Sequence, residues 1–362
     1  MALSKITLQN FRNHAASELG ETAHFNLLVG ENGAGKTNVL EALSLLSPGR
    51  GLRRAHLSDL ARTLPGSEET GAFAIGASLI EQGQVSARIG SYTEAERPTR
   101  RLVRINGAEA SASALSEWHA VSWLTPAMDG LFNDSAGARR RFVDRMTLAV
   151  EPMHVKSVNA LENALRERNR LLETRGDAHW LDAIEAQAAQ HGAVVTQNRA
   201  RLVDLLAEEL SALPPEPFAR PILKYCAGGP SDVSDLLAMF ARERPRDRAA
   251  GRALSGPHRD ELEVVIASSG QSATSCSTGE QKAMLIAIIL AHGVLASSGR
   301  PSVLLMDEVA AHLDPVRRAE LFKRLRAGKA QIWLTGTELA PFAEIEAEAA
   351  IWRVSGGALE RL

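Results

Sequence analysis

The sequence predicts an α/β fold that contains a parallel sheet. Two strand-like segments and the polar residues that follow them lead to this prediction. A largely apolar run at residues 25–29 precedes a glycine-rich segment, and a second run at 302–306 ends in Asp307 and Glu308. Apolar runs of this length are typical of strands that are buried on both faces, as in parallel sheets.

The segment from Gly30 to Thr37 matches the P-loop pattern GxxxxGK[ST], and a helical pattern follows it. Glycines let backbone N–H groups approach phosphate oxygens, and the following helix directs the positive end of its dipole at them. Lys36 is predicted to reach the β- and γ-phosphates of ATP, and Thr37 to hold Mg²⁺. A glycine-rich turn without a ligand is the alternative, but it leaves the flanking strand and helix unexplained. The residues predicted here to bind the nucleotide are Gly30, Glu31, Asn32, Gly33, Ala34, Gly35, Lys36, Thr37 and Asn38.

Asp307 and Glu308 predict the second half of a hydrolysis site. Asp307 is predicted to join Thr37 at the metal, and Glu308 to act as the catalytic residue that polarises the attacking water. A solvated turn with two carboxylates is the alternative. The pair lies about 270 residues after the P-loop. This long separation predicts an insertion between the two halves of the nucleotide-binding lobe.

The segment Ser277–Lys282 precedes an apolar helix predicted from Ala283 to Leu295. Ser277 and Glu280 match a capping box, which satisfies backbone N–H groups in the first helical turn. A capped helix that begins shortly before the acidic strand is also the arrangement of the ABC-type ATPase signature. In that class Ser277, Thr278 and Gly279 are predicted to contact the nucleotide bound to the other subunit. Residues 311–314 then stand at the position of the D-loop, so the order of motifs predicts a site that is completed in a dimer.

The remaining elements follow in chain order. Residues 6–46 predict a strand, a turn, a strand, the P-loop and a helix, and a strand meander is predicted at 73–80, 85–89 and 102–105. Helical spacing from 138 to about 213 predicts a helical hairpin that is interrupted near 174–177 and stopped by the prolines at 214, 215 and 217. A helix at 233–241 and a strand at 262–267 complete the series.

The order of these elements predicts two lobes. The ATP-binding head lobe is expected to be discontinuous, with residues 1–125 and 255–362. A mainly helical lobe with a short arm is expected at 126–254. The fold class is therefore an α/β, ABC-type P-loop ATPase head with an inserted helical second lobe.

Composition narrows the class further. The chain has 362 residues, of which 45% are hydrophobic and 23% charged, and its two cysteines, Cys226 and Cys276, form no CxxC pair. This excludes a disulfide framework and a zinc site of the usual spacing. The N-terminus has no secretory apolar segment, and the apolar helix at 283–295 is too short to span a bilayer. We therefore expect a cytoplasmic protein with no membrane association.

The formal net charge of −2 does not by itself indicate nucleic-acid binding. The basic residues are mostly arginine, and some of the arginines form three local clusters. Each cluster either contacts DNA phosphates or forms a solvated helix face that pairs with neighbouring glutamates. The clusters are Arg139–Arg141 with Arg145, the row Arg166, Arg168 and Arg170, and the run from Arg242 to Arg252.

Six segments spread over nearly the whole chain form one series of motifs. They are Leu8–Asn13, Gly30–Asn38, Arg139–Asp144, Ser255–Asp260, Ser277–Lys282 and Leu304–Pro315. The series resembles the RecF family of recombination mediators, which is related to the SMC and Rad50 heads. The segment SGPHRD at 255–260 is largely peculiar to that family, so it makes the resemblance more specific than the ABC-type motifs alone.

The resemblance implies a function in recombinational repair and replication-fork maintenance. It implies an ATP-dependent homodimer that binds DNA at gaps and single-strand/duplex junctions, helps RecO- and RecR-type mediators load RecA, and supports the SOS response. Weak DNA-dependent ATP hydrolysis would reset this ATP-switched clamp. Arg12, in the N-terminal motif, is included among the residues predicted to bind the nucleotide.

Two other ABC-type ATPases are the alternatives. A transporter subunit would place its signature closer to the P-loop and a switch histidine after the acidic strand, where this chain has Thr335-Gly336-Thr337. Thr335 or Thr337 is a candidate for a γ-phosphate contact instead. A Rad50- or SMC-like protein would need a far longer heptad arm. No Q-loop residue can be assigned near Trp123.

Overall fold

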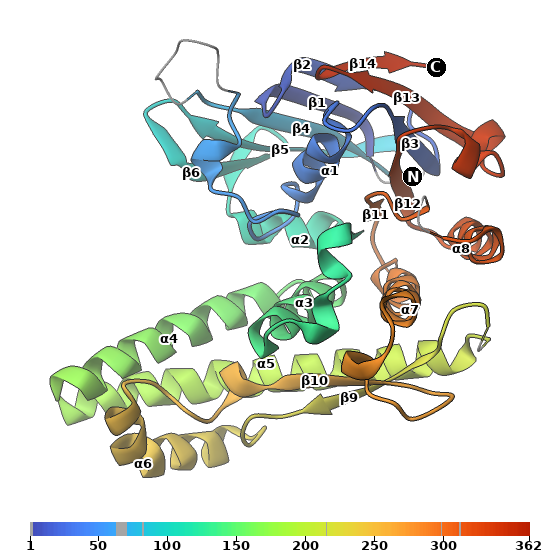
Figure 1. Cartoon of the computed structure of the whole chain (residues 1–362). Coiled ribbons are helices and arrows are strands. Elements are labelled where there is room, and N and C mark those ends of the chain that lie inside the picture. The colour runs from blue at the N-terminus through green and yellow to red at the C-terminus, as the bar shows by residue number, and fades with distance from the viewer. Residues whose placement is uncertain (1–2, 63–70, 82, 215, 298, 311–312) are drawn as a thin grey trace. The chain divides into compact units, whose positions relative to one another are not determined.

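The computed structural model describes residues 3–62, 71–81, 83–214, 216–297, 299–310 and 313–362 (Figure 1). The chain divides into two compact units, and each is described here by itself. Unit 1 comprises Met1–Met128 and Ile289–Leu362, and unit 2 comprises Asp129–Ile288. The second boundary falls within helix α7 (Thr278–Ala296).

Unit 1 contains a mixed sheet in the order β14-β13-β3-β12-β11-β8. The five strands from β13 to β8 are parallel, and β14 pairs with β13 in the antiparallel sense. Every residue of β3, β8, β11 and β12 is buried, as expected for strands with both faces covered. The strands are β3 (Phe25–Val29), β8 (Ala120–Leu124), β11 (Ser302–Met306), β12 (Gln331–Gly336), β13 (Ala349–Ser355) and β14 (Ala358–Arg361).

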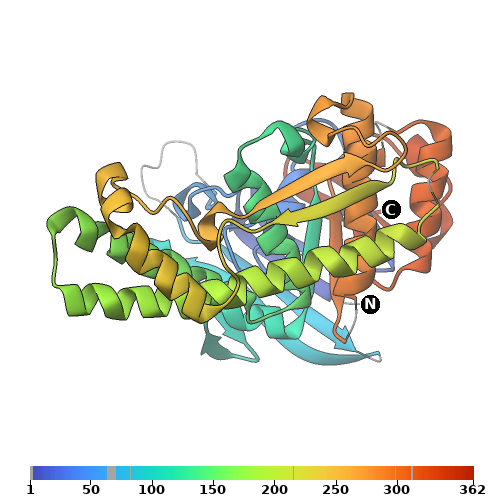
Figure 2. The same cartoon turned by 90° about the horizontal axis from the view of Figure 1, so that it is seen from below.

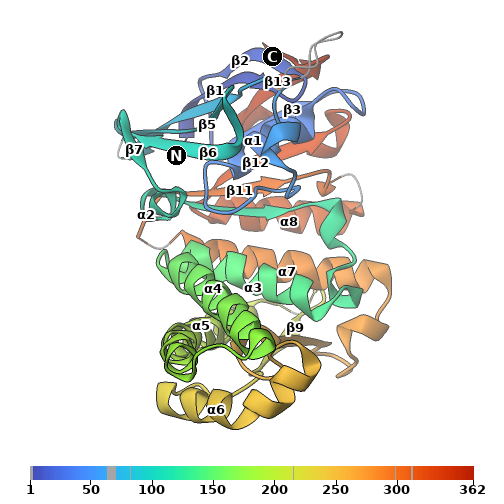
Figure 3. The ribbon, with the colours of Figure 1, turned by 90° about the vertical axis from the view of Figure 1, so that its left-hand side faces the viewer.

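A second sheet of unit 1 is antiparallel, in the order β2-β1-β4-β5-β6-β7. Helix α1 (Lys36–Ser44) contacts β1 of this sheet and β8 and β12 of the other, so it lies between the two sheets (Figure 3). Val39 and Leu40 of α1 belong to one apolar core together with residues of both sheets. The antiparallel strands are β1 (Leu3–Phe11), β2 (His14–Leu19), β4 (Ala74–Glu81), β5 (Gln84–Glu94), β6 (Arg97–Ile105) and β7 (Ala108–Ala110); α2 (Leu115–Trp118) and α8 (Pro315–Ala327) complete unit 1.

Unit 2 is mainly helical. Helices α4 (His154–Thr174) and α5 (Ala178–Ala212) form a long hairpin, and the predicted interruption near 174–177 is confirmed. The hairpin β9 (Pro221–Cys226) and β10 (Glu261–Ile266) is antiparallel, and β9 contacts α5 (Figure 2). Helices α3 (Ala136–Val150) and α6 (Val233–Ala250) pack against α5.

The structure differs from the sequence-based boundaries at several places. Unit 2 extends to residue 288, and not to 254, because β10 pairs along its whole length with β9. Strand β2 was not predicted, since its sequence HAASEL lacks an apolar alternation. Helix α6 continues past the predicted end at 241 to Ala250, with Pro245 inside it, because Asp247 is anchored in the interior.

Helix α7 has 19 residues, so the predicted length of about 13 was wrong. By length and mean hydropathy it would pass as a membrane-spanning helix, with a mean hydropathy of 1.3. One such helix is weak support for a membrane span, because the core helices of soluble proteins have the same composition. In this protein 67% of the apolar window is buried. Both cysteines are free, as predicted.

Candidate nucleotide-binding site

The candidate site lies at the carboxyl edge of the parallel sheet of unit 1. Strands β3, β12 and β11 are neighbours in the sheet, so the residues after each strand meet at one edge. This brings the P-loop after Val29, Thr335 at the end of β12, and Asp307 after Met306 together. Thr37 and Asp307, 270 positions apart in the sequence, therefore lie within hydrogen-bond distance of each other, and their predicted role at a metal remains a prediction.

The P-loop backbone adopts conformations that side chains would prevent. Gly33 and Gly35 have φ angles of 82° and 116°, in the left-handed region. A Cβ atom on Gly30 would collide with the carbonyl oxygen of Val354. Among the described residues, the N–H groups of Gly33, Gly35, Lys36 and Thr37 have no protein acceptor. A loop with several free amides at a helix N-terminus fits an anion such as a phosphate group.

Lys36 is the cation of this loop. Its side chain is only 4% exposed, and Nζ donates to the carbonyl oxygens of Gly30 and Glu31 at 2.6 and 2.9 Å. No carboxylate of the described residues forms an ion pair with it. A buried ammonium that has only neutral partners is stabilised by an anionic ligand. The arrangement therefore fits the triphosphate of ATP.

Thr37 and Asp307 are the residues of the site that could hold a metal ion. The Thr37 hydroxyl donates to both carboxylate oxygens of Asp307, at 2.9 and 3.1 Å. Mg²⁺ binds oxygen at about 2.0–2.1 Å in an octahedron, so its neighbouring ligands lie about 2.9 Å apart. The Thr37 and Asp307 oxygens have this spacing, and both residues fit the ion. The described residues contain no cluster of three or more His, Cys, Asp or Glu side chains, and Mg²⁺ at nucleotide sites usually takes one or two carboxylates plus phosphate.

Glu308 follows Asp307 in a conformation that is rare for a residue with a side chain. Its φ angle is 52°, and its N–H donates to the hydroxyl oxygen of Thr335 at 2.9 Å. The Thr335 hydroxyl in turn donates to Asp307 Oδ1 at 2.8 Å. Thr335 therefore holds both acidic residues by hydrogen bonds. The γ-phosphate contact suggested for Thr335 or Thr337 remains a prediction. Left-handed backbone in a non-glycine residue is costly and often marks functional positions.

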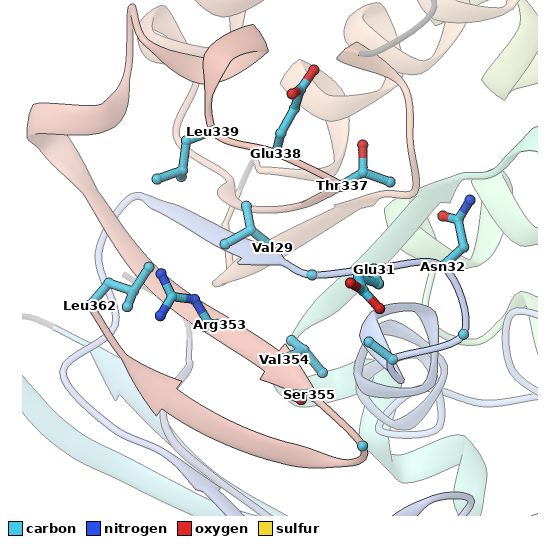
Figure 4. Close-up of a pocket in the computed structure, with 14 residues that line it drawn as sticks. Val29, Glu31, Asn32, Thr337, Glu338, Leu339, Arg353, Val354, Ser355 and Leu362 are labelled. Carbon is cyan, nitrogen blue, oxygen red and sulfur yellow. The ribbon is translucent and has the colours of Figure 1, made fainter.

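A pocket of about 670 Å³ lies beside the P-loop. Figure 4 shows Glu31 and Asn32 of the P-loop on one side, and Thr337 and Glu338 after β12 on another. The hairpin of β13 and β14 closes the third side with Arg353, Val354 and Ser355. Thr337 is thus a pocket residue, although it was predicted only as an alternative to Thr335.

Arg12 lies beside the P-loop helix in a fixed position. Its guanidinium makes two bonds of 2.9 and 2.8 Å to the carboxylate of Glu41, which is on α1. Asn38 donates to Asn13 and accepts from Arg53, at 2.7 Å in both cases. The predicted nucleotide contacts of Arg12 and Asn38 are not tested by these bonds and remain predictions.

The signature segment belongs to unit 2. The capping box is present: Ser277 N and Oγ both donate to Glu280 Oε2 at 2.8 Å, and Glu280 N donates to Ser277 Oγ at 3.3 Å. Ser277, Thr278 and Gly279 are exposed at the start of α7. Their contact with a nucleotide on a second subunit remains a prediction. Of the D-loop, residues 311–312 lie outside the described residues, and Asp314 caps α8 by accepting from Arg317 N at 2.9 Å.

The motif at 255–260 is an internal anchor of unit 2. Asp260 is 1% exposed and accepts from Arg199 at 2.8 Å and from Gly228 N at 2.8 Å. Tyr225 also donates to it, and Arg199 continues to Asp144 with bonds of 2.7 and 2.9 Å. Hydrogen bonds from His154 and the charge of Arg199 hold the pKa of Asp144 below its usual value, against the effect of burial.

The basic clusters are divided between internal and exposed positions. Arg139 pairs with Glu261 at 2.7 Å, Arg140 donates to the Asp260 carbonyl at 2.8 Å, and burial lowers the pKa of Arg145 to about 9. Arg168 is fully buried between Glu185 and Asp247. The exposed members are Arg141, Arg166, Arg170, Arg242, Arg246, Arg248 and Arg252.

Sequence reasoning assigned no role to Asn13, His14, Glu41 or the particular contacts of Thr335. Asn13 was noticed only as part of the N-terminal motif. His14 follows Asn13 at the start of strand β2, which the sequence did not predict, so no sequence pattern pointed to His14. Glu41 lies on the P-loop helix four residues after Thr37, a spacing that places both residues on the same face. The spacing of Thr37 and Glu41 is the one sequence feature that could have indicated a role for Glu41.

The chain is similar to known proteins over nearly its whole length. A family model described as the RecF/RecN/SMC N terminal domain matches residues 2–357. The DNA replication and repair protein RecF of Mesorhizobium japonicum is 45% identical over 370 residues, which cover 98% of this chain and 96% of the relative. The protein of the same name from Brucella suis biovar 1 is 44% identical over 373 residues, 99% of this chain and 96% of the relative.

Solved structures show the same fold. The recombination mediator protein RecF-ATPrS in the RecFOR pathway has a TM-score of 0.86 at 21% identity, over 99% of this chain and 98% of that chain. An SMC head bound to the C-winged helix domain of ScpA has a TM-score of 0.57 at 15% identity, over 100% and 98%. The predicted fold class, an ABC-type ATPase head of the SMC and Rad50-like class, is confirmed. The chain therefore belongs to the RecF family, within the wider group that shares the RecF/RecN/SMC N-terminal domain.

Proposed function

We propose that this protein is an ATP-switched DNA clamp of recombinational repair and replication-fork maintenance. One observation carries the proposal: the P-loop, its lysine and the Thr37–Asp307 pair are assembled at one sheet edge in a geometry that fits Mg²⁺ and a triphosphate. Solved RecF structures with ATP and with ATPrS support ATP as the nucleotide. The names of the relatives support a role in replication and repair.

The proposed hydrolysis needs only groups that are already in place. Lys36 and the loop amides would bind the β- and γ-phosphates, and Thr37 and Asp307 would hold Mg²⁺, which neutralises charge between these phosphates. Glu308 would orient water for in-line attack on the γ-phosphate. Phosphoryl transfer depends mostly on positioning and charge stabilisation.

ATP is proposed to close a homodimer through the signature helix. Ser277, Thr278 and Gly279 are exposed, and the N-terminus of a helix attracts negative charge. Replacing Ser277 by arginine should leave ATP binding intact, since Lys36 and Thr37 belong to the same subunit as the nucleotide. The variant should remain monomeric in ATP, as measured by sizing, because a bulky cation would occupy the approach of the partner's γ-phosphate.

DNA is proposed to be bound at gaps and single-strand/duplex junctions through its backbone. A mediator that acts at any sequence has no use for base readout. The exposed arginines of unit 2, above all Arg141, Arg242 and Arg246, are the candidates, whereas Arg139, Arg140 and Arg168 are bound internally. Affinity should fall with salt with a slope of about −0.9 per neutralised phosphate. Arg141→Glu should weaken binding to all sequences about equally.

The protein is proposed to work in the cytoplasm with RecR- and RecO-type mediators, to help load RecA and to support the SOS response. The placing of solved relatives in the RecFOR pathway supports these partners. The decisive experiment is nucleotide-dependent sizing with and without gapped DNA. Glu308→Gln should accumulate as an ATP-bound dimer with slow single-turnover hydrolysis. A Glu308→Gln protein that hydrolyses at the parental rate, or that stays monomeric in saturating ATP, would sink the proposal.

Lys36→Ala provides the matching control for ATP binding. The charge-assisted contacts of the ammonium are worth roughly 1.5–3 kcal/mol each, so ATP affinity should fall by about one to two orders of magnitude. Dimerisation and ATP-dependent DNA binding should be lost with it. Fluorescent nucleotide titration measures the first effect, and parental affinity in this variant would contradict the site.

A further inference from the structure

Two turns from distant parts of the chain meet the P-loop of unit 1. One is the turn between β1 and β2, with Asn13 and His14. The other is the turn between β13 and β14, with Gly356 and Gly357. Both turns place hydrogen-bond donors against P-loop carbonyl groups, and neither was part of the predicted site.

The carbonyl oxygen of Ala34 receives two donors from outside the loop. Asn13 Nδ2 donates to it at 2.8 Å, and Gly357 N donates to it at 3.1 Å. In a trans peptide the N–H points opposite to the C=O. Pulling the Ala34 carbonyl toward these turns therefore directs the Gly35 N–H the other way, and this N–H has no protein acceptor among the described residues.

Asn13 is itself fixed in one orientation. Its Oδ1 accepts from Asn38 Nδ2 at 2.7 Å, so the amide cannot flip without losing a bond at each end. The approach is very close, because a Cβ on Gly35 would lie 2.5 Å from Asn13 Nδ2. A Cβ on Gly357 would likewise collide with the Asn13 carbonyl. The two glycines therefore let three chain segments meet.

His14 acts on the next peptide. It is fully buried, and its Nε2 lies 3.2 Å from the Gly35 carbonyl oxygen. A carbonyl only accepts, so Nε2 must carry the proton. Burial lowers the pKa of His14, which keeps the ring neutral and leaves Nδ1 as an acceptor. The Ser17 hydroxyl, 3.1 Å from Nδ1, can donate to it and so fix this tautomer, or donate to Gly357 O at 3.1 Å.

The contacts of Asn13 and His14 differ in how much they contribute to orienting the loop peptides. The Gly35 carbonyl also accepts the first helical bonds, from Asn38 N at 3.0 Å and Val39 N at 3.2 Å, so the helix already orients that peptide. The Ala34 carbonyl has no helical donor among the described residues, and its orientation depends on Asn13 and Gly357. Asn13 should therefore matter more than His14.

We propose that Asn13 and His14 are positioning residues for the bound nucleotide: through the carbonyl groups of Ala34 and Gly35 they turn the N–H groups of Gly35 and Lys36 toward the phosphates. The turn at Gly357 shares this task. The inference rests on the proposed nucleotide function of the P-loop. It adds that the loop is pre-organised from outside, by residues that never touch the ligand.

The test compares Asn13→Ala with a matched control, Asn26→Ala. Asn26 is buried in unit 1, whereas Asn13 is half-buried, and Asn26 Nδ2 donates to the carbonyl oxygens of Ala23 and Ile332, which are not in the loop. One hydrogen bond of about 1 kcal/mol corresponds to roughly a fivefold change in affinity. We expect Asn13→Ala to weaken ATP and ADP binding about fivefold, and Asn26→Ala to lower the melting temperature without changing nucleotide affinity in the folded protein.

His14 supplies the second measurement. His14→Leu should weaken nucleotide binding by about twofold, and His14→Gln, which retains a donor, should restore part of it. If Asn13→Ala binds ATP as the parent does while Lys36→Ala does not, the inference is wrong and the nucleotide site stands. If the parent itself fails to bind ATP, the proposed function fails instead. If Asn13→Ala and Asn26→Ala lost nucleotide affinity equally, Asn13 would contribute only to the stability of the fold, and the inference would be wrong.

Discussion

The two units of this protein surround their buried cations with different kinds of partner. In unit 1, Lys36 is buried with two carbonyl groups as its partners, and the loop amides around it point at no protein acceptor among the described residues. In unit 2, Arg168 is fully buried against the carboxylates of Glu185 and Asp247, and it also donates to Phe240 O.

The difference separates a binding site from a structural core. A cation that is left without a carboxylate gains most from an anionic ligand, whereas a cation enclosed by carboxylates is already satisfied. The same rule explains why a count of arginines is a poor guide to DNA contacts in unit 2. Four arginines of the candidate clusters, Arg139, Arg140, Arg168 and Arg244, serve internal contacts instead.

Removing a buried cation from the core of unit 2 should give the largest loss of stability among these predictions. Arg168→Met removes the cation from between Glu185 and Asp247. Arg244 still pairs with Glu185, but the buried Asp247 loses its ion pair, which should cost about 3–5 kcal/mol of unfolding free energy. Arg170→Met is the matched control, because Arg170 is exposed and pairs with Glu167 at 2.5 Å on the same helix. That variant should change stability by less than about 1 kcal/mol. Urea unfolding measures both, and equal losses would contradict the contrast between the units.

Low pH should destabilise the protein through a buried neutral histidine of unit 1. His119 is 1% exposed, and burial, aided by the charge of Arg300, lowers its pKa from 6.5 to about 4. Between these pH values the unfolded chain binds a proton that the folded chain does not. The stability due to the neutral ring is thus present above pH 6.5 and is lost as the pH falls through 4, by roughly 3 kcal/mol at the acid limit.

His119→Leu should remove this dependence. Unfolding by urea at several pH values between 7 and 4 should show a smaller loss of stability in the variant than in the parent. A parent and variant with parallel pH profiles would mean that the ring does not titrate in this range.

Thr335→Val tests the hydroxyl that joins the two acidic residues of the nucleotide site. The variant loses the bonds to Asp307 and from Glu308 N, worth about 1–1.5 kcal/mol in positioning. Hydrolysis should slow by roughly five- to tenfold, with ATP affinity nearly unchanged. Thr147→Val is the control, because Thr147 is a buried threonine of α3 whose hydroxyl donates to the Val143 carbonyl oxygen within the same helix. A Thr335→Val protein with the parental single-turnover rate would remove Thr335 from the mechanism.

Ser277→Ala should have the smallest effect. It removes the capping hydroxyl of α7, at a cost of about 1 kcal/mol in stability. A small side chain does not block a partner, so dimerisation in ATP should persist, in contrast to Ser277→Arg. Melting temperature and sizing on one preparation test both expectations. Loss of the dimer in Ser277→Ala would show that the hydroxyl itself contacts the nucleotide.

The sequence was most informative where the chemistry is local. The P-loop occupies eight consecutive residues, and Ser277 and Glu280 are three residues apart, so their patterns could be recognised directly. The ion pairs of Arg168 join residues 17 and 79 positions away, and no local spacing encodes them. The boundary of unit 2 was misplaced for the same reason, because β10 finds its partner β9 across helix α6.

The order of the strands in the main sheet has a consequence during protein synthesis. Strand β3 leaves the ribosome early, but its neighbours β12 and β13 are made about 300 residues later. At roughly 5–20 residues per second this delay lasts roughly 15–60 s. Unit 2 is contiguous, and its last residue, Ile288, is made before β12 and β13. A nascent chain therefore contains the whole P-loop motif before the site is assembled, and its apolar β3 has neither of its sheet neighbours until the last strands are made.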